Sequence, residues 1–411
     1  MSFSNKNVLI TGITGFVGSH LARELVGRDA NVFGLARRRA DGSRPRNLVD
    51  KGICDQVGLI EGDITDIVSV GACLRQSKPD IVFHLAAQSF VPRSFVNPLE
   101  ALVANVLGTA NLLESIRLQE LDPTIVFAGS SEEYGLVFGS QRDYERAVAK
   151  YGNIFPEPQG FPEFPINEGN PLRPISPYAL SKVQADYLMR SYHAVYGLRT
   201  IVSRGFNHEG AGRGIIFVTS AIASQVMKLK LGETNRIVVG NVNTFRDWSH
   251  ISDIVAGYCL LAEKGRYGDV YVQGSMRTNS ILTFILLSLQ NAGWVLRKIE
   301  SMENSKTMDD PTEKDSSEIF GVSFEKTKVD KLMLQEALEF TLEDRGIWVH
   351  TDRGKIPVEF EPDRYRPLDV PILFSDPTKI KGIGFKVSHT LEDIINDQLN
   401  YFVSKENRSL D

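Results

Sequence analysis

The chain has 411 residues, a formal net charge of −5, 42% hydrophobic residues and 24% charged residues. This composition is that of a globular protein and excludes collagen-like, coiled-coil and disordered classes. Acidic and basic residues nearly balance, so no general attraction to nucleic acid or to an anionic membrane is expected. The three cysteines are too few and scattered for a disulfide framework, and we expect reduced thiols in a cytoplasmic protein.

No targeting or membrane segment is expected. The first ten residues, MSFSNKNVLI, lack the basic-then-apolar order of a secretory signal. The most apolar run, 281–289, is half the length needed to span a bilayer.

Short apolar runs alternate with helical stretches over the first 130 residues. Strands are predicted at 7–11, 31–36, 56–64, 80–87 and 124–130, and helices at 16–25 and 102–116. Compact β-branched strands that alternate with helices indicate right-handed βαβ units. The predicted fold is α/β: a Rossmann-type, doubly wound parallel sheet with a smaller mixed α/β C-terminal substrate-binding lobe.

Two segments interrupt this pattern. Residues 136–170 carry four prolines and several aromatic residues, which predicts a segment too irregular for a helix. Residues 297–318 are strongly polar and are expected to form an exposed or mobile connection. Helical stretches are predicted after it, at 329–342 and 391–402.

A glycine-rich loop directly follows the first predicted strand. Its sequence, TGITGFVG, supplies the candidate cofactor contacts Thr11, Gly12, Gly15, Phe16, Val17 and Gly18. Glycine allows the tight turn, the close approach of the main chain to a pyrophosphate, and the close packing of the next helix, whose N-terminus faces the phosphates. A plain glycine-rich turn is the alternative, but the strand before the loop and the helix after it favour dinucleotide binding.

The end of the second predicted strand indicates which dinucleotide is bound. A site for NAD carries an acidic residue there, whereas this chain has three consecutive arginines from Arg37. Guanidinium groups suit a 2′-phosphate, so the expected cofactor is NADP, with Arg37 and Arg38 as ligands. A solvated basic loop and contact with nucleic acid are the alternatives, and neither explains why the cluster falls at this junction. The residues expected to flank the adenine, after the third strand, are Asp63 and Ile64.

A tyrosine and a lysine four residues apart, Tyr178 and Lys182, lie in the segment SPYALSK and would share one face of a helix. A phenol with a pKa of about 10 is a poor base at neutral pH, and an ammonium one turn away stabilises the phenolate. The lysine can also hold the nicotinamide ribose. Ser130 ends a predicted strand of the same sheet and can hydrogen-bond a substrate hydroxyl or the tyrosine. These three side chains can move a hydride between a carbinol and NADP.

Together these motifs resemble the extended short-chain dehydrogenase/reductase family and, within it, the GDP-mannose branch of the nucleotide-sugar 4,6-dehydratases. The similarity runs through TGITGFVGSHLA, HLAAQSFVPRSF, NVLGTANLLE, SSEEYG, SPYALSK, FNHEG and GNVNTFRDWSHISD, and resumes in RYRPLDVPILFSDPTKIK. The resemblance implies a homodimer or homotetramer. It also implies further cofactor contacts at Leu85, Ala86 and Ala87.

The same resemblance implies the reaction. Dehydratases of this family carry a glutamate two residues after the active serine or threonine, as Glu132 does here, where 4-epimerases commonly carry an uncharged residue. Oxidation at C4 makes the C5 hydrogen acidic, and a carboxylate can remove that proton as hydroxide leaves C6. A solvated loop carboxylate is the alternative for Glu132. Glu133 aligns with an apolar position of the family and is left out of the catalytic set, which is Ser130, Glu132, Tyr178 and Lys182.

The diphosphate of a nucleotide sugar requires cations and hydrogen-bond donors. The residues that the resemblance assigns to the substrate are Ser89, Ser131, Glu132, Asn207, Arg213, Val218, Arg246 and Arg366. A surface ion pair is the alternative for any single arginine. His84 and His208 show no metal spacing, and no metal is expected.

The predicted protein is thus a lyase that converts a nucleotide hexose, with GDP-mannose favoured, to the 4-keto-6-deoxy product. Its predicted domains are 1–205, NADP-binding, with an insertion at 136–166, and 206–411, mainly the substrate-binding lobe with elements that return to the first domain. The insertion could form a lid over the sugar, a contact between subunits or a surface loop. An epimerase, a uronate decarboxylase and a non-catalytic NADP-binding regulator are the alternative functions.

Overall fold

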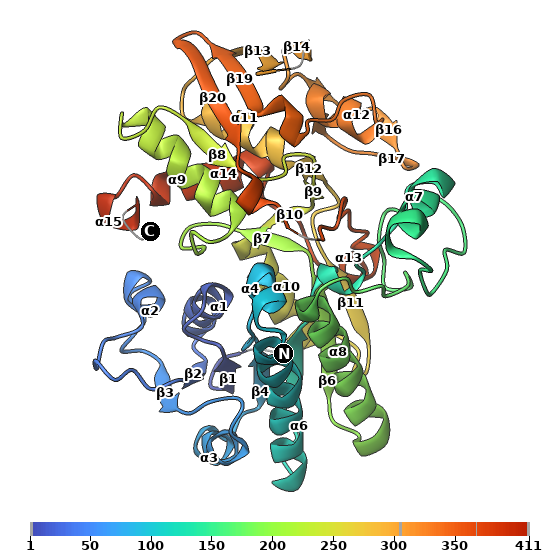
Figure 1. Cartoon of the computed structure of the whole chain (residues 1–411). Helices are drawn as coiled ribbons and strands as arrows, with labels where there is room; N and C mark the ends of the chain where they lie inside the picture. Colours follow the sequence, from blue (N-terminus) through green and yellow to red (C-terminus); the bar gives the residue numbers. More distant parts are fainter. Residues whose placement is uncertain (1–2, 304–305, 367, 409–411) are drawn as a thin grey trace.

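The structure is a computed structural model that describes residues 3–303, 306–366 and 368–408. Asn304 and Ser305 of the polar stretch and Pro367 of the RYRP motif therefore lie outside the described residues. Figure 1 shows a sheet with flanking helices below and a smaller lobe above it.

Seven parallel strands form the larger sheet, in the order β11-β6-β5-β4-β1-β2-β3. Their bounds are β1 Asn7–Thr11, β2 Asn31–Ala36, β3 Gly58–Glu61, β4 Ile81–His84, β5 Thr124–Ala128, β6 Thr200–Gly205 and β11 Val270–Gln273. The order reverses between β1 and β4, and a crevice for a ligand opens at such a point beyond the carboxyl ends of the strands. The predicted Rossmann-type sheet is confirmed.

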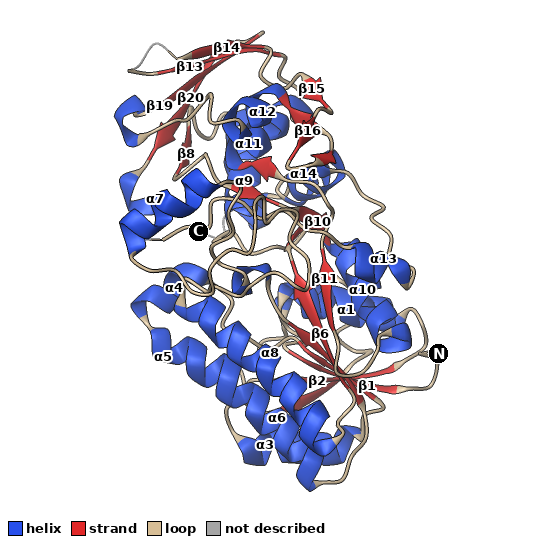
Figure 2. Ribbon diagram, turned by 90° about the vertical axis from the view of Figure 1, so that its right-hand side faces the viewer, coloured by secondary structure: helices blue, strands red, loops and turns tan. Residues whose placement is uncertain are grey.

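Helices cover both faces of this sheet (Figure 2). Along β1, Val8 and Ile10 belong to one hydrophobic cluster and Leu9 to another, because successive side chains of a strand point to opposite faces. The first cluster includes apolar residues of α1 (Phe16–Val26) and α10 (Ile251–Lys264). The second includes residues of α3 (Ile67–Ser77), α6 (Gly108–Leu118) and α8 (Pro177–Tyr196). Burial on both faces explains why these strands are almost continuously apolar.

The upper lobe is built on a five-stranded sheet in the order β14-β13-β19-β20-β8, antiparallel except for the β20–β8 pair. Its strands are β8 Ile237–Val239, β13 Leu296–Ser301, β14 Thr307–Asp309, β19 Gly346–Thr351 and β20 Gly354–Phe360. The main helices are α9 Val218–Lys230, α11 Ile281–Asn291 and α14 Leu391–Tyr401. One hydrophobic core joins the helices to the sheet.

Short elements complete the chain between and around the two sheets. The remaining helices are α2 Arg46–Asp50, α4 Val91–Val96, α5 Pro98–Ala101, the π-helix η1 Leu102–Leu107, the 3₁₀ turn η2 Ser131–Glu133, α7 Gln141–Tyr151, α12 Lys328–Leu334, η3 Leu342–Asp344, η4 Pro362–Arg364, α13 Thr378–Gly382 and α15 Lys405–Arg408. The remaining strands are β7 Asn207–Glu209, β9 Phe245–Arg246, β10 Trp248–His250, β12 Asn279–Ser280, β15 Lys314–Asp315, β16 Glu318–Ile319, β17 Val322–Ser323 and β18 Lys326–Thr327.

Elements from downstream of residue 205 also belong to the larger sheet. Strand β11 pairs with β6, α10 packs beneath the sheet, and α13 packs against β11. The division into two domains at residues 205 and 206 stays a prediction.

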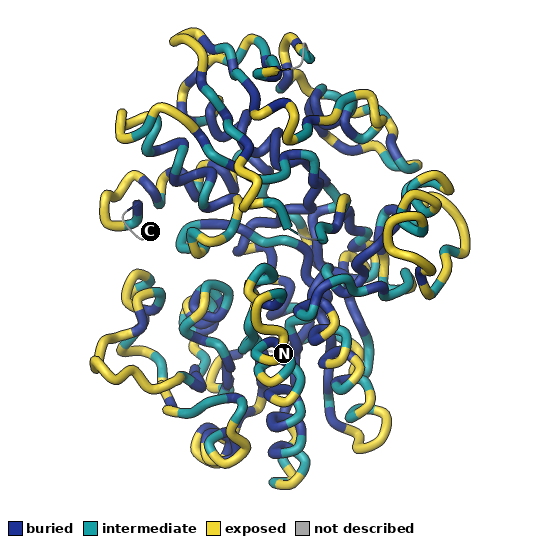
Figure 3. Tube along the Cα trace, viewed as in Figure 1, coloured by how far each residue is buried: buried dark blue, intermediate teal, exposed yellow. Residues whose placement is uncertain are grey.

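The expectation that 136–170 is too irregular for a helix is wrong. Helix α7 occupies 141–151, and its prolines all follow it. Ser140 caps the helix by accepting a hydrogen bond from the N–H of Asp143 at 3.2 Å. No residue of α7 is buried, and Figure 3 shows its largely exposed trace at the edge of the molecule. A surface helix has little apolar content, so its composition resembled that of a loop.

The expectation that 297–318 is an exposed or mobile connection is also wrong, since its described residues include β13 and β14. In β13, Ile299 is fully buried between partner strands while its neighbours Lys298 and Glu300 are half-buried. A strand of an antiparallel sheet that exposes one face to solvent carries many polar side chains. The helix predicted at 329–342 ends at Leu334, because Glu336 adopts a left-handed conformation with φ of 56°. The helix predicted at 391–402 is confirmed as α14.

Candidate active site

A cavity of about 1830 Å³ lies between the larger sheet and the lobe. It is lined by the glycine loop, the ends of β2, β4 and β5, helix α8 and segments of the lobe. All the predicted site residues except Thr11 and Arg38 line it: Gly12, Gly15, Phe16, Val17, Gly18, Arg37, Asp63, Ile64, Leu85, Ala86, Ala87, Ser89, Ser130, Ser131, Glu132, Tyr178, Lys182, Asn207, Arg213, Val218, Arg246 and Arg366.

The glycine loop packs closely against the end of β4 and against its own helix. Gly12 has a φ of +77°, and a Cβ there would lie 2.8 Å from the main-chain nitrogen of Ala86. A Cβ on Gly18 would lie 2.2 Å from the carbonyl oxygen of Gly12. Gly15 is the N-cap of α1 and has no side chain to cap it, so the first N–H groups of the helix stay available to an anion.

Thr11 and Arg38 have other contacts. The Thr11 hydroxyl lies 2.7 Å from Nδ1 of His84 and accepts hydrogen bonds from the N–H groups of Leu85 and Ala86, each at 3.2 Å. Thr11 is fully buried and joins β1 to the end of β4 behind the cavity. Arg38 is exposed and lies 3.9 Å from Glu61.

Ser130, Tyr178 and Lys182 meet at the end of β5. The Ser130 hydroxyl is close enough to the Tyr178 phenol to lower its pKa, against the larger opposing effect of burial. The Lys182 ammonium donates a hydrogen bond to the carbonyl oxygen of Ala128 at 2.8 Å and lies 6.0 Å from the centre of the Tyr178 ring. Burial raises the pKa of Tyr178 to about 12 and lowers the pKa of Lys182 to about 8. Burial disfavours the charged form of both groups. A charged ligand group that binds in this site would therefore change the protonation of both strongly.

Glu132 is half-buried on η2 and lines the same cavity. Its main-chain N–H donates to the Ser130 hydroxyl at 3.2 Å, which fixes the turn after β5. The carboxylate of Glu132 is one of the groups whose charge raises the pKa of Tyr178. A carboxylate and a phenol thus face one cavity from neighbouring elements.

A buried polar network contacts the helix that carries Tyr178 and Lys182. Sequence reasoning did not assign this network a role. Asn105, on η1, donates to the Ser181 hydroxyl at 2.8 Å and accepts from the N–H of Gln88 at 2.8 Å. His84 bridges Thr11 and Thr109, with Nε2 at 2.9 Å from the Thr109 hydroxyl. The signal in the sequence was Asn105, the one polar residue of the apolar run 102–107. The π-helical turn was not foreseen, and such turns are frequent at functional sites.

The lobe side of the cavity is polar. The side-chain oxygen of Asn207 is buried and has no hydrogen-bond partner within the described residues, so it can receive a donor from a ligand. Arg213 stacks on Phe217, 3.6 Å from the ring centre, and lies 5.3 Å from the Phe16 ring of the glycine loop. Its Nε is 3.5 Å from Glu209. Arg213 therefore spans the boundary between the cofactor loop and the lobe.

Arg246 and Arg366 share one carboxylate, that of Asp369, which sequence reasoning missed. Nη2 of Arg246 lies 2.7 Å from Oδ1 of Asp369, and Nη1 of Arg366 lies 3.5 Å from the same oxygen. Arg246 also donates to the carbonyl oxygens of Phe245 and Val370. Asp369 stands three residues after Arg366, so the spacing alone could have marked it.

No group of histidine, cysteine, aspartate and glutamate in the part of the chain that the structure describes is arranged to hold a metal ion. Within the same residues, the helices are all too short or too polar to cross a bilayer.

Comparison with known proteins places this geometry in a family. The model of the NAD dependent epimerase/dehydratase family matches residues 8–274. The chain is 31% identical to GDP-mannose 4,6 dehydratase 1 of Arabidopsis thaliana, over 87% of this chain and 96% of that protein. It is 29% identical to the GDP-mannose 4,6-dehydratase sdnI of Sordaria araneosa, over 96% of this chain, and spans 60% of that relative's length.

The fold is also that of a solved structure, RMD from Pseudomonas aeruginosa complexed with NADPH. The TM-score is 0.65 at 22% identity, and the match covers 97% of this chain and 99% of that one. The glycine loop after β1, the Ser130, Tyr178 and Lys182 group, and the family match over most of the chain agree. The chain belongs to the NAD dependent epimerase/dehydratase family.

Proposed function

We propose that this protein is an NADP-dependent nucleotide-sugar 4,6-dehydratase that acts on a GDP-linked hexose, with GDP-mannose as the first candidate. The observation that carries the proposal is Glu132, a carboxylate that lines the cavity together with Tyr178 and Ser130 and whose charge acts on the Tyr178 phenol. Epimerisation at C4 requires no base for C5, whereas elimination of water across C5 and C6 does. The relatives named above carry the same activity in their names.

The residues divide the reaction between them. Tyr178 accepts the proton of the C4 hydroxyl, and Ser130 orients that hydroxyl through its own. The Lys182 ammonium stabilises the phenolate. Glu132 removes the C5 proton and delivers it to the departing C6 hydroxyl, so that water leaves. Tyr178 then returns its proton to C5, and the net change is the loss of one water. The nicotinamide cofactor, when bound, supplies the position that takes the C4 hydride and returns it to C6.

The residues at the end of β2 fit NADP. Arg37 is exposed, lines the cavity, and has no ion-pair partner among the residues that the structure describes. A free guanidinium suits a 2′-phosphate. The open N-terminus of α1 suits the pyrophosphate. Asp63 and Ile64 line the same end of the cavity, where they would flank the adenine.

The lobe residues fit a nucleoside diphosphate. Asn207 offers an unpaired acceptor, and Arg213 and Arg366 offer positive charge along the cavity. Planar guanidinium groups bind diphosphates through paired hydrogen bonds. No residue of the insertion 136–166 lines the cavity, so a lid over the sugar is not favoured. The oligomeric state and the cytoplasmic location stay predictions.

The test is incubation with NADP and GDP-mannose. A dehydratase gives a 4-keto sugar, detected by its alkaline ultraviolet absorbance and by the loss of one water in the product mass. Parallel incubations with UDP-galactose and UDP-glucuronate test the alternatives: a changed hexose of equal mass indicates an epimerase, and release of carbon dioxide a decarboxylase. Absence of turnover with every nucleotide sugar, with NADP still bound, would overturn an enzymatic role in favour of a regulator.

The variant Glu132→Gln tests the role of the carboxylate. The amide keeps the size of the side chain but is no base. We expect loss of 4-keto product with NADP affinity unchanged. Retained elimination would show that another group removes the C5 proton.

A further inference from the structure

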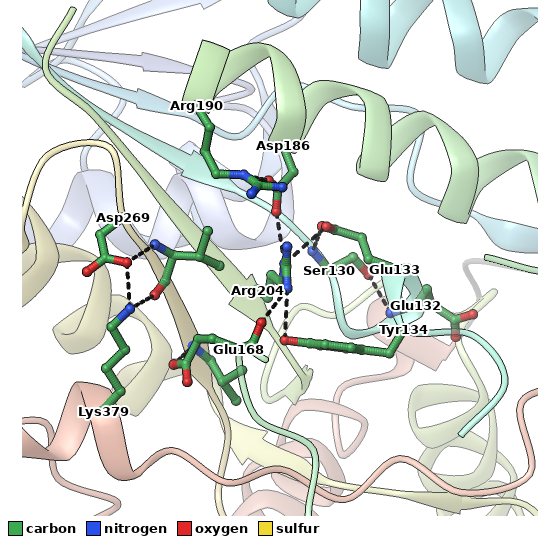
Figure 4. Close-up of polar contacts among 12 residues, drawn as sticks. Ser130, Glu132, Glu133, Tyr134, Glu168, Asp186, Arg190, Arg204, Asp269 and Lys379 are labelled. Atoms are coloured by element: carbon green, nitrogen blue, oxygen red, sulfur yellow. Dashed lines mark hydrogen bonds and ion pairs between the residues drawn. The ribbon is translucent and has the colours of Figure 1, made fainter. Parts of the chain in front are cut away.

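Glu133 follows Glu132 directly, yet it has a different environment. Its side chain is fully buried, and the reaction described above does not use it. Figure 4 shows its carboxyl group beside the main chain of Ser130 and next to Arg204. Burial of a carboxyl group is costly unless hydrogen bonds and charges compensate it.

One oxygen of Glu133 holds the turn. Oε1 accepts a hydrogen bond from the main-chain N–H of Ser130 at 2.7 Å. A Cβ on Gly129 would lie 2.7 Å from the same oxygen, so the carboxyl packs directly against the main chain before Ser130. Because Ser130 also caps η2 through its own side chain, the two contacts form a reciprocal capping box. The position of the Ser130 hydroxyl therefore depends on Glu133.

The other oxygen faces a buried cation. Oε2 lies 3.3 Å from Nε of Arg204, on β6, and the same nitrogen lies 2.8 Å from Oδ2 of Asp186, on α8. Arg204 also donates to the hydroxyl of Tyr134 at 3.2 Å, and Asp186 accepts from Arg190 at 2.6 Å. Two carboxyl groups thus share one fully buried guanidinium (Figure 4).

Glu133 and Lys182 bind the same short stretch of main chain, at the N–H of Ser130 and at the carbonyl oxygen of Ala128. Burial and the nearby Asp186 raise the pKa of Glu133 to about 8, against the opposing effect of Arg204. The Glu133 carboxylate is also the one neighbouring charge that raises the pKa of Lys182, whose burial lowers it. The titratable and charged groups that interact with Glu133 are Tyr134 at the end of its own turn, Arg204 from β6, and Tyr178, Lys182 and Asp186 from α8.

We propose that Glu133 is a positioning residue, whose buried carboxyl group fixes Ser130 through its main-chain N–H and, when ionised, favours the ammonium form of Lys182. This inference rests on the proposed function for the reaction that Ser130 and Lys182 serve. Glu133 and Asp186 contact the same Arg204, but Glu133 alone contacts Ser130 and acts on Lys182. Asp186→Asn is therefore the matched control, since it replaces the other carboxyl group on the same guanidinium.

The first measurement requires no substrate. Carbon-13 NMR of the lysine Cε, with the signal assigned by its loss in Lys182→Met, follows the titration of Lys182 in the full-length protein. In Glu133→Gln we expect its midpoint to fall by about half a pH unit or more, because a neighbouring negative charge is gone. In Asp186→Asn we expect the midpoint to stay or rise, because Glu133 loses a like-charged neighbour and ionises more readily.

The second measurement is the pH profile of kcat. Glu133→Gln keeps an oxygen for the Ser130 N–H, so we expect kcat near neutral pH within a few-fold of the unmodified enzyme and an alkaline limb at lower pH. Glu133→Leu removes that acceptor, and we expect kcat to fall about ten- to hundredfold with the NADP affinity unchanged.

The outcomes separate the two proposals. An unchanged Lys182 midpoint in Glu133→Gln, or equal downward shifts in Glu133→Gln and Asp186→Asn, would overturn the positioning role and leave a purely structural ion pair. If no nucleotide sugar is turned over, the proposed function fails, while the NMR comparison still decides whether Glu133 controls Lys182. If Glu133→Leu does not fold, the comparison of the glutamine and asparagine variants remains decisive.

Discussion

Arg246 and Asp369 form an ion pair of 2.7 Å on the lobe side of the cavity, and both residues line it. Arg366 lies 3.5 Å from the same Asp369 oxygen. Asp369 therefore holds two guanidinium groups in place before any ligand arrives, which lowers the ordering cost of binding a diphosphate.

Asp369→Asn is expected to raise the KM for the nucleotide sugar about tenfold and to change kcat less, because the two arginines lose their common anchor. The control is Asp55→Asn, which removes the same charge from an exposed pair with Arg44 at 2.9 Å. Steady-state kinetics measure both. Equal KM values for the two variants would show that Asp369 does not orient the arginines.

Arg37→Ala is expected to weaken NADP binding about tenfold or more and to leave NAD binding nearly unchanged, since the guanidinium is proposed to bind the 2′-phosphate. Titration calorimetry with each cofactor measures the effect. Arg38→Ala is the control, because Arg38 lies beside Glu61 and does not line the cavity. A larger loss in Arg38→Ala than in Arg37→Ala would reverse the assignment.

The insertion 136–166 packs against residues of the lobe that follow the polar stretch 297–318. The rings of Phe164 and Phe320 lie 4.9 Å apart, and Arg142 and Arg146 form ion pairs with Glu336 at 3.6 and 3.1 Å. None of these five residues lines the cavity, so the two segments contact each other away from it.

Phe320→Ala is therefore expected to lower the free energy of unfolding by about 2 kcal/mol, since Phe320 is half-buried, with kcat unchanged. Urea denaturation measures the stability. Phe155→Ala, in the same insertion but 86% exposed, is expected to change it by less than about 0.5 kcal/mol. A large loss of kcat in Phe320→Ala would mean that the insertion acts on the site.

The buried histidines predict sensitivity to acid. Burial lowers the pKa of His84 to about 3 and those of His20 and His208 to about 4. The unfolded chain binds protons near the ordinary histidine pKa of 6.5, so stability is full above that pH and falls as the pH drops toward 4. The slope is up to about 1.4 kcal/mol per pH unit for each histidine. In His84→Asn, urea denaturation at a series of pH values should show a weaker dependence of the unfolding free energy on pH. The difference corresponds to up to one proton fewer taken up on unfolding. An unchanged slope would show that His84 is not neutral in the fold.

Local sequence patterns were enough to predict the parts of the protein that depend on neighbouring residues. A β-branched strand, a glycine loop and an amphipathic helix follow one another from Asn7 to Val26 and form a contiguous unit. Their order dictates a parallel sheet with a dinucleotide crevice. Tyr178 and Lys182 share a helical face because they are four residues apart, which requires no knowledge of distant contacts.

Which polar residues are buried, and what they pair with, depends on contacts between distant parts of the chain. Strand β13 has few apolar residues and forms because β14 and β19 supply its hydrogen bonds and cover Ile299. Glu133 and Arg204 are 71 positions apart, and no local pattern reports that β6 places a guanidinium beneath the turn after β5. Hydrophobic periodicity indicates which face of an element is covered. The pairing of buried charges depends instead on which strands become neighbours, and that is fixed only when the chain folds.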